Sequence, residues 1–235
     1  MVDSLLRIAD LPDALRQQIQ ERASGIPFFV EEVVRSLIDN GAVVSEERIV
    51  ENGQTQVFWR ASEIGQQIEI PDNLQSLLAA RIDRLQEETR QILQLAAVFG
   101  RSFYQRVLMT VGSQSNGAGM EIERGIGRLL QLEMIREAAR MPELEYKFSN
   151  PLTQEVAYQT ILRKQRREFH LLVAEAMEVL FPQQLAELAP RLAFHFREAE
   201  LLDRAIGYYA MAGEAAFRLY ANREAIAHYD DCLLY

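Results

Sequence analysis

The stretch Ile122–Phe148, IERGIGRLLQLEMIREAARMPELEYKF, decides the fold of the middle of this chain. Its first part carries apolar residues at helical spacing and predicts a helix over Ile122–Leu132. Two alternating runs follow, Met134–Glu137 and Leu144–Phe148, and they flank the pair Pro142-Glu143. The sequence therefore predicts a helix followed by a two-stranded ribbon.

Helices are also expected upstream of this stretch. Apolar side chains recur at helical spacing from Leu74 to Leu85 and from Ile92 to Phe99. A third helix is expected over Phe103–Val111, and the small and polar run Gly112–Gly119 predicts a loop. Three or four helices before a two-stranded ribbon is the plan of a winged helix. A winged-helix subdomain is therefore expected over about 71–160.

Residues 1–42 are expected to form a helical subdomain. An amphipathic pattern runs from Leu11 to Arg22. Pro27 fits the first turn of a second helix, because its missing N–H costs nothing there, and Asn40-Gly41 is a signal for the end of that helix. Glu31 and Glu32 are expected near the positive end of its dipole.

The chain changes character at residues 43–70, where β-prone runs replace helical patterns. Asn52-Gly53 lies between two such runs, and this pair is a strong signal for a hairpin. A hairpin or extended linker is therefore expected, with Pro71-Asp72 starting the next helix.

From Asn150 onward the pattern is helical. Ala205–Tyr209 (AIGYY) and Ala225–Tyr229 (AIAHY) repeat at an offset of 20 residues. Small residues beside tyrosines are typical of stacked tetratricopeptide-like hairpins. Their period is longer, about 34 residues, which favours an echo from helix to helix over one from repeat to repeat. Residues 161–235 are expected to form a helical-repeat segment that is truncated inside an array. The expected helices are roughly 151–162, 165–180, 187–199, 201–212, 213–220 and 222 to the end.

The last expected helix should then leave apolar side chains uncovered, because stacked repeats bury such faces only against the next repeat. These side chains are Ile226, Tyr229, Leu233 and Leu234. The helix is expected to fray or to pair with another copy of the chain, and further repeats would cover it as a protein-binding surface.

Composition excludes several classes of protein. With 49% hydrophobic and 25% charged residues among 235, the chain is neither disordered nor fibrous. The single Cys232 excludes an internal disulfide framework. A net charge of −9 disfavours general affinity for nucleic acid and for anionic membranes. With neither a leader pattern nor a long apolar run, the cytoplasm is the expected compartment and no membrane partner is expected.

No self-contained active site is visible in the sequence. A P-loop needs a lysine after its glycines, and the only lysines are Lys147 and Lys164, neither in such a motif. His170, His195 and His228 lie far apart in the sequence beside one cysteine, which disfavours zinc; His170 and His195 are expected to be packing histidines. We therefore expect no catalytic residue, no metal and no enzyme activity of this chain alone.

Two features bear on DNA. In the expected recognition helix, about Glu121 to Leu132, Arg124 and Arg128 are offset by Glu121 and Glu123, and Glu133 follows; this favours a packing role over a groove-reading one. The basic run Arg163–Arg167 predicts either a solvated helix start or, less favoured, a phosphate clamp.

Several ordered motifs resemble the C-terminal part of the bacterial STAND-class AAA+-like ATPase module, which is found in cyclase-linked regulators and large transcriptional activators. The resemblance covers nearly the whole chain. It is carried by Gly25–Glu32 (GIPFFVEE), Ile70–Leu85 (IPDNLQSLLAARIDRL), Ala96–Phe103 (AAVFGRSF), Tyr146–Tyr158 and Arg166–His170.

The resemblance implies a lid over about 1–42, the winged helix and the start of a sensor array. It also implies a P-loop domain upstream and further repeats downstream as partners, with ATP or ADP bound only in the complete module. In the family the Gly-x-Pro motif brings its proline against adenine, which carries over to Gly25 and Pro27. A histidine that reaches the phosphates in several relatives corresponds to Asn150 here, which offers neutral hydrogen bonds but no charge.

The function expected from these observations is that of a regulatory fragment of a STAND-type signalling ATPase, which couples nucleotide state to a helical-repeat sensor and to an output domain outside this sequence. A DNA-binding winged-helix regulator and a helical-repeat scaffold are the alternatives. Pro27 keeps two interpretations, a helix-initiating proline and a nucleotide contact.

Overall fold

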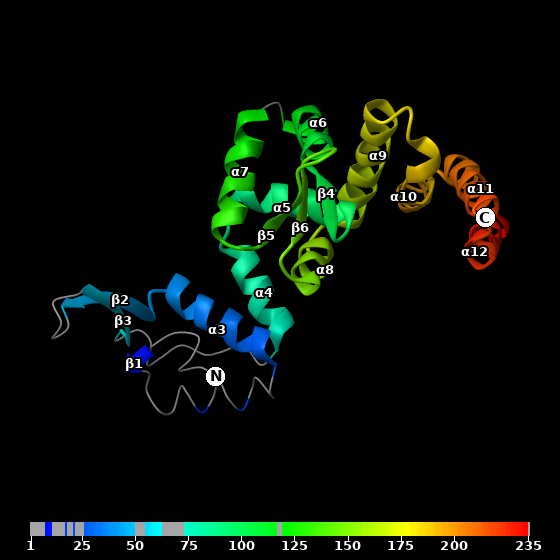
Figure 1. Cartoon of the computed structure of the whole chain (residues 1–235). Coiled ribbons are helices and arrows are strands. Elements are labelled where there is room, and N and C mark those ends of the chain that lie inside the picture. Colours follow the sequence, from blue (N-terminus) through cyan, green and yellow to red (C-terminus); the bar gives the residue numbers. More distant parts are fainter. Residues whose placement is uncertain are drawn as a thin grey trace. The chain divides into compact units, whose positions relative to one another are not determined.

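The computed structural model describes residues 8–10, 17, 21, 26–49, 55–62, 73–116 and 119–234. The chain is mainly helical and divides into two compact units, Met1–Arg84 and Leu85–Tyr235 (Figure 1). The helix near residue 80, assigned from the sequence to the segment 71–160, belongs to the first unit. The finer four-part division stays a prediction.

In the first unit, helix α3 (Pro27–Asp39) begins at Pro27 and ends before Asn40, as predicted. Gly41 follows with a φ of 66°, a left-handed conformation that favours glycine. One face of α3 packs into an apolar cluster that also includes Leu77. The expectation for Glu31 and Glu32 was wrong, because the first turn of α3 holds no acidic residue.

The predicted hairpin of the first unit is present. Strands β2 (Val43–Ile49) and β3 (Thr55–Ala61) pair antiparallel, with Ile49 opposite Thr55. A third strand, β1 (Ile8–Asp10), pairs parallel with β3 and was not predicted. Asn52-Gly53 lies outside the described residues, as does most of the helix expected over 11–22, of which Gln17 and Glu21 are described and helical.

Helix α4 (Leu74–Asp83) closes the first unit. It begins after Asn73, not at Pro71-Asp72 as expected, because the Asn73 side chain accepts a hydrogen bond of 2.8 Å from the N–H of Ser76 and caps the helix. Leu77, Leu78 and Ile82 are buried along its inner face.

The second unit opens with three helices around a small antiparallel sheet of order β4-β6-β5 (Figure 1). The central strand β6 brings Tyr146 opposite both Phe103 and Glu137. The elements are α5 (Glu87–Phe99), β4 (Ser102–Tyr104), α6 (Gln105–Asn116), α7 (Gly119–Gln131), β5 (Ile135–Ala139) and β6 (Glu145–Phe148).

Two expectations for this region were wrong. Phe103 does not start a helix but lies in β4, where it is fully buried with its ring centroid 5.8 Å from that of Tyr146, so the sheet has three strands. Gly112 does not open a loop but lies within α6. A Cβ there would come within 2.2 Å of Ile122 Cδ1. The glycine therefore serves the close approach of α6 and α7.

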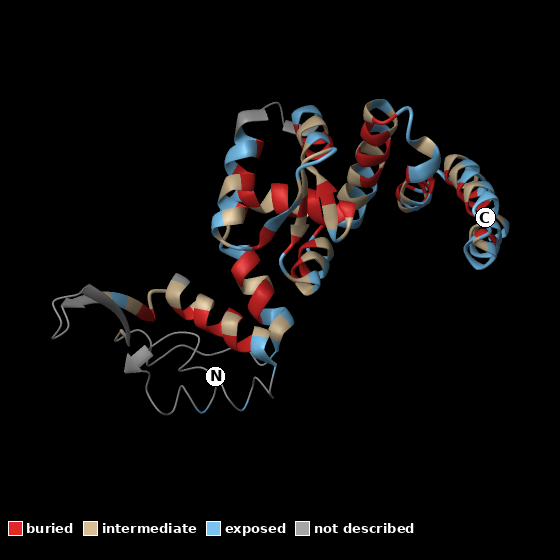
Figure 2. Ribbon diagram, in the orientation of Figure 1, coloured by how far each residue is buried: buried red, intermediate tan, exposed pale blue. Residues whose placement is uncertain are grey.

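Five further helices follow, and each has buried residues, red in Figure 2, although the last of them buries only Ala225. The break expected between 212 and 213 is absent, because Gly213 lies within a single helix with its Cα facing the ring of Tyr229. The helices are α8 (Pro151–Gln159), α9 (Arg163–Leu180), α10 (Leu185–Glu198), α11 (Leu202–Arg218) and α12 (Asn222–Leu233).

The 20-residue echo runs from helix to helix. Glu200 and Tyr220, which follow α10 and α11, have left-handed φ angles of 60° and 58°. In each turn the next residue donates its N–H back to the preceding helix, Leu201 to Phe196 and Ala221 to Ala216. The two turns that precede the repeated stretches Ala205–Tyr209 and Ala225–Tyr229 thus share one geometry.

Candidate functional site

Pro27 lies at the first position of α3, and its side chain is exposed beside the exposed Ile26. The ring fixes a helical φ without giving up a hydrogen bond, which explains why α3 starts there. Gly25, the other residue of the predicted adenine contact, lies outside the described residues. The structure thus supports the helix-initiating role of Pro27 directly and leaves its apolar ring accessible.

Asn150 caps helix α8 in the second unit. Its Oδ1 atom accepts a hydrogen bond of 2.7 Å from the N–H of Leu152, so the oxygen of the side-chain amide is engaged in the cap. Within the described part of the chain, no hydrogen bond involves its Nδ2 group. Asn150 can therefore donate to a further acceptor while it caps the helix, and within its own unit it meets no other predicted site residue.

A buried ion pair in the first unit was missed by the sequence analysis. Arg81 of α4 donates to a carboxylate oxygen of Glu32 of α3 at 2.7 Å, and the two residues are only 7% and 3% exposed. The signal was present, because Glu32 is a carboxylate within the apolar face Phe29–Leu37. The pair joins α3 to α4, and a charge buried in this way needs its partner.

Two histidines that are 25 residues apart in the sequence are in contact in the second unit. The Nδ1 atoms of His170 (α9) and His195 (α10) lie 2.8 Å apart, and His170 Nε2 lies 3.0 Å from the Tyr158 hydroxyl of α8. Both rings are buried, at 0% and 1% exposure. The sequence predicted packing histidines, and it gave no sign that His170 and His195 form one hydrogen-bonded joint between three helices.

Burial holds this joint in the neutral state. It lowers the pKa of His170 to about 4, with smaller contributions from Arg166 and Arg197, and it lowers the pKa of His195 well below the usual range. Each neutral imidazole carries one N–H, so one Nδ1 donates and the other accepts. If His170 donates, Tyr158 donates to His170 Nε2; if His195 donates, His170 donates to Tyr158.

The His170–His195 pair is a structural joint and not an acid–base centre. A substrate cannot reach rings that are this deeply buried. Imidazoles whose pKa lies so far below the usual value stay neutral at neutral pH, so they carry no proton that is ready for transfer. Nor does the described part of the chain hold a group of three His, Cys, Asp or Glu side chains that could bind a metal ion.

The basic run Arg163–Arg167 is largely engaged within the protein. Arg166 donates to the carbonyl oxygens of Tyr158 and Ile161, both at 3.1 Å, and its guanidinium lies 4.1 Å from the centre of the Tyr158 ring. Arg163 and Arg167 both contact Glu200. These contacts favour the structural interpretation of the run over a phosphate clamp.

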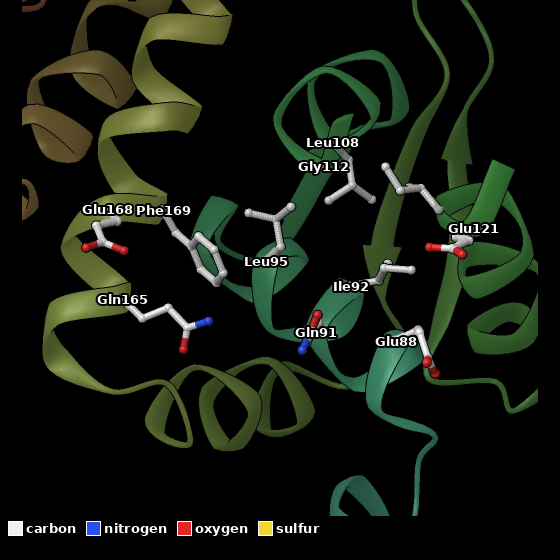
Figure 3. A pocket seen from close by; sticks show the side chains of 11 residues that line it. Glu88, Gln91, Ile92, Leu95, Leu108, Gly112, Glu121, Gln165, Glu168 and Phe169 are labelled. Carbon is white, nitrogen blue, oxygen red and sulfur yellow. The ribbon is translucent and has the colours of Figure 1, made fainter. Parts of the chain in front are cut away.

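A cavity of about 290 Å³ lies between α5, α6, α7 and α9 of the second unit (Figure 3). Apolar side chains and three glutamates border it. No sequence pattern indicated this cavity, because its lining comes from four helices spread over about eighty residues and depends on how they pack.

The comparisons with known proteins give one partial match. A family model described as "Domain of unknown function (DUF8739)" matches residues 1–53, and this description names no activity. No curated protein and no solved structure matches the chain. Among the described helices, none is both long and apolar enough to cross a membrane.

Proposed function

We propose that the chain is a regulatory part of a STAND-type signalling ATPase, in which it couples nucleotide state to a helical-repeat sensor. The observation that carries the proposal is the order of elements in the second unit. The order of helix, strand, two helices and two strands, with sheet order β4-β6-β5, supports the winged-helix prediction. Packed helices follow it directly, in the order that the family resemblance implies.

Contacts within the second unit offer a physical route for such coupling. Helix α9 packs against both α5 and α6, so the helical segment is seated on the winged-helix-like part. The His170–His195 pair and Tyr158 join α8 to α9 and α10. Contiguous packed elements of this kind can carry coupling, so a shift of α8 at Asn150 would be transmitted to α10 through the hydrogen-bonded histidine pair.

The chain's own residues would bind nucleotide without hydrolysing it. In the first unit, the family resemblance assigns the accessible ring of Pro27, with Gly25, to the adenine of ATP or ADP. In the second unit, it assigns Asn150, whose Nδ2 can still donate, to phosphate sensing. Cleavage needs positioned cationic charge, which this sequence does not assemble into a P-loop. In this proposal a P-loop domain outside the sequence supplies this cationic charge, and another domain produces the signalling output.

The test uses the natural polypeptide that contains this sequence, isolated from its source cells with an antibody against residues 85–235. Its intact mass and its bound nucleotide are then measured. The proposal predicts a mass well above 26.9 kDa and about one ATP or ADP per chain. A polypeptide of the present size, free of nucleotide, would contradict the proposal.

A DNA-binding regulator is the second candidate, favoured by the same order of elements. The charges on the exposed face of α7 count against it, because Glu121 and Glu123 balance Arg124 and Arg128. Few phosphate contacts could then release counterions. A gel shift with mixed-sequence duplex at about 100 mM salt distinguishes the two candidates. A salt-sensitive complex of micromolar or tighter affinity would favour the DNA-binding regulator.

A further inference from the structure

The cavity between α5, α6, α7 and α9 has an apolar floor. Ile92, Leu95, Leu108 and Ile122 border it, and each is at most 8% exposed. In Figure 3 the ring of Phe169 from α9 is turned toward Leu95 of α5. Ligand sites are concave and mostly apolar with a few polar groups, so an open hollow of about 290 Å³ against such side chains offers space for a small ligand.

The rim of the cavity is anionic. Glu88, Glu121 and Glu168 line it and are exposed, and no ion pair or hydrogen bond occupies their carboxylates in the described part of the chain. Among the described residues that line the cavity there is no lysine or arginine. A charged ligand that enters here must therefore be positive.

The charge is not spread evenly around the rim. Glu168 also borders a basic concavity that is lined by Arg163, Lys164 and Arg167 of α9, and these cations offset its charge. In Figure 3, Glu88 and Glu121 stand on the opposite side of the cavity from Glu168 and Phe169. The two sides of the cavity thus differ, with Glu88 and Glu121 on one side and Phe169 with the charge-offset Glu168 on the other.

We propose that this cavity binds a small organic cation, an ammonium or guanidinium group carried on one apolar ring or short chain. The cationic group faces Glu88 and Glu121, and the apolar body lies against Leu95 and Phe169. The volume of about 290 Å³ is just below the usual range for ligand pockets, about 300–1,000 Å³, which fits a one-ring ligand and not a nucleotide. This site is separate from the residues proposed to contact ATP or ADP.

The experiment measures the binding of 2-phenylethylammonium to the full chain by titration calorimetry at low salt, with 3-phenylpropionate as a probe of similar shape and opposite charge. The variant Glu88→Gln/Glu121→Gln removes two carboxylates that make no ion pair or hydrogen bond with the described residues, so its fold should be unchanged. We expect binding of the cation only, and a loss of affinity of at least about tenfold in the variant, which corresponds to about 1.4 kcal/mol.

The matched control removes carboxylates away from the cavity. Glu187→Gln/Glu224→Gln changes the net charge by the same amount at exposed positions of α10 and α12, and it should bind like the unchanged chain. Equal loss of affinity in both double variants would show a general charge effect and overturn the proposal. Binding of 3-phenylpropionate as tight as that of the cation, or no binding of the cation at 10 mM (about 2.7 kcal/mol), would also overturn it.

Discussion

The two units each bury one polar contact between helices, and they do so in opposite states of charge. In the first unit Glu32 and Arg81 form an ion pair at 2.7 Å, whereas in the second His170 and His195 face each other at 2.8 Å as neutral rings. The ion pair depends on keeping its charges, and the histidine pair depends on having none. Although the two contacts are buried to a similar depth, their opposite charge states predict different responses to mutation and to pH.

The largest effect is expected from breaking the ion pair. Arg81→Met leaves the Glu32 carboxylate buried without its partner, which should lower the free energy of unfolding of the first unit by about 3–5 kcal/mol. Denaturant unfolding followed by the fluorescence of Trp59 measures it, because this single tryptophan lies in β3 of the first unit.

The matched variant Glu32→Leu/Arg81→Met removes both charges and should recover most of that loss, since a buried ion pair can be replaced by apolar side chains at little cost. If the double variant were as unstable as Arg81→Met, the loss would come from packing and not from an unpaired charge.

The next largest effect is expected in how the free energy of unfolding of the second unit depends on pH. Folding lowers the pKa of His170 from about 6.5 to about 4, so the unfolded state binds more protons in this range and stability falls as the pH drops through it. The loss should approach roughly 1.4 kcal/mol per pH unit for each histidine that stays neutral. Unfolding followed by far-ultraviolet circular dichroism at a series of pH values measures the slope.

The control for this prediction is His170→Leu/His195→Leu, in which the slope between pH 6.5 and 4 should be much smaller. A slope that persists unchanged in this variant would assign the acid sensitivity to other groups.

A smaller effect is expected from removing one ring of the histidine joint. His195→Leu keeps an apolar side chain of similar size but leaves His170 Nδ1 without its partner, which should cost about 1–3 kcal/mol at neutral pH. This cost should be below that of Arg81→Met, because an unpaired neutral group is less costly to bury than an unpaired charge. Denaturant unfolding measures both costs. A larger loss of stability in His195→Leu than in Arg81→Met would contradict this difference between the two units.

The smallest effect is expected at the outer end of the joint. Tyr158→Phe removes one hydroxyl that lies 3.0 Å from His170 Nε2, and it should cost about 1 kcal/mol. The ring and its contact with Arg166 remain, so a loss as large as that of His195→Leu would mean that Tyr158, and not the histidine pair, holds α8 to α9.

Local signals in the sequence predicted the start of α3 and the paired strands β2 and β3, because Pro27 and the alternating runs act within a few residues. The sequence misled where one residue type serves two purposes. Gly112 predicted a loop but allows close packing of α6 and α7, and Phe103 lies in a strand too short to show an alternating pattern.

The contacts that the sequence could not predict depend on how helices pack. His170 and His195 meet only because α9 and α10 present these positions to each other, and the cavity depends on four helices at once. The role of Asn150 as the cap of α8 was not predicted either, since this residue was assigned only to phosphate sensing. The exposed Ile226, Tyr229, Leu233 and Leu234 on the last helix agree with the expectation of an apolar edge.

The most direct test of the central proposal is hydrogen exchange on the natural polypeptide in its ADP-bound state and with a non-hydrolysable ATP analogue. We predict a nucleotide-dependent change at the start of α3 around Pro27, and a second change in α8–α10 around the His170–His195 pair. A change at α3 alone would show binding without coupling. Identical exchange of both regions with the two nucleotides would contradict the account.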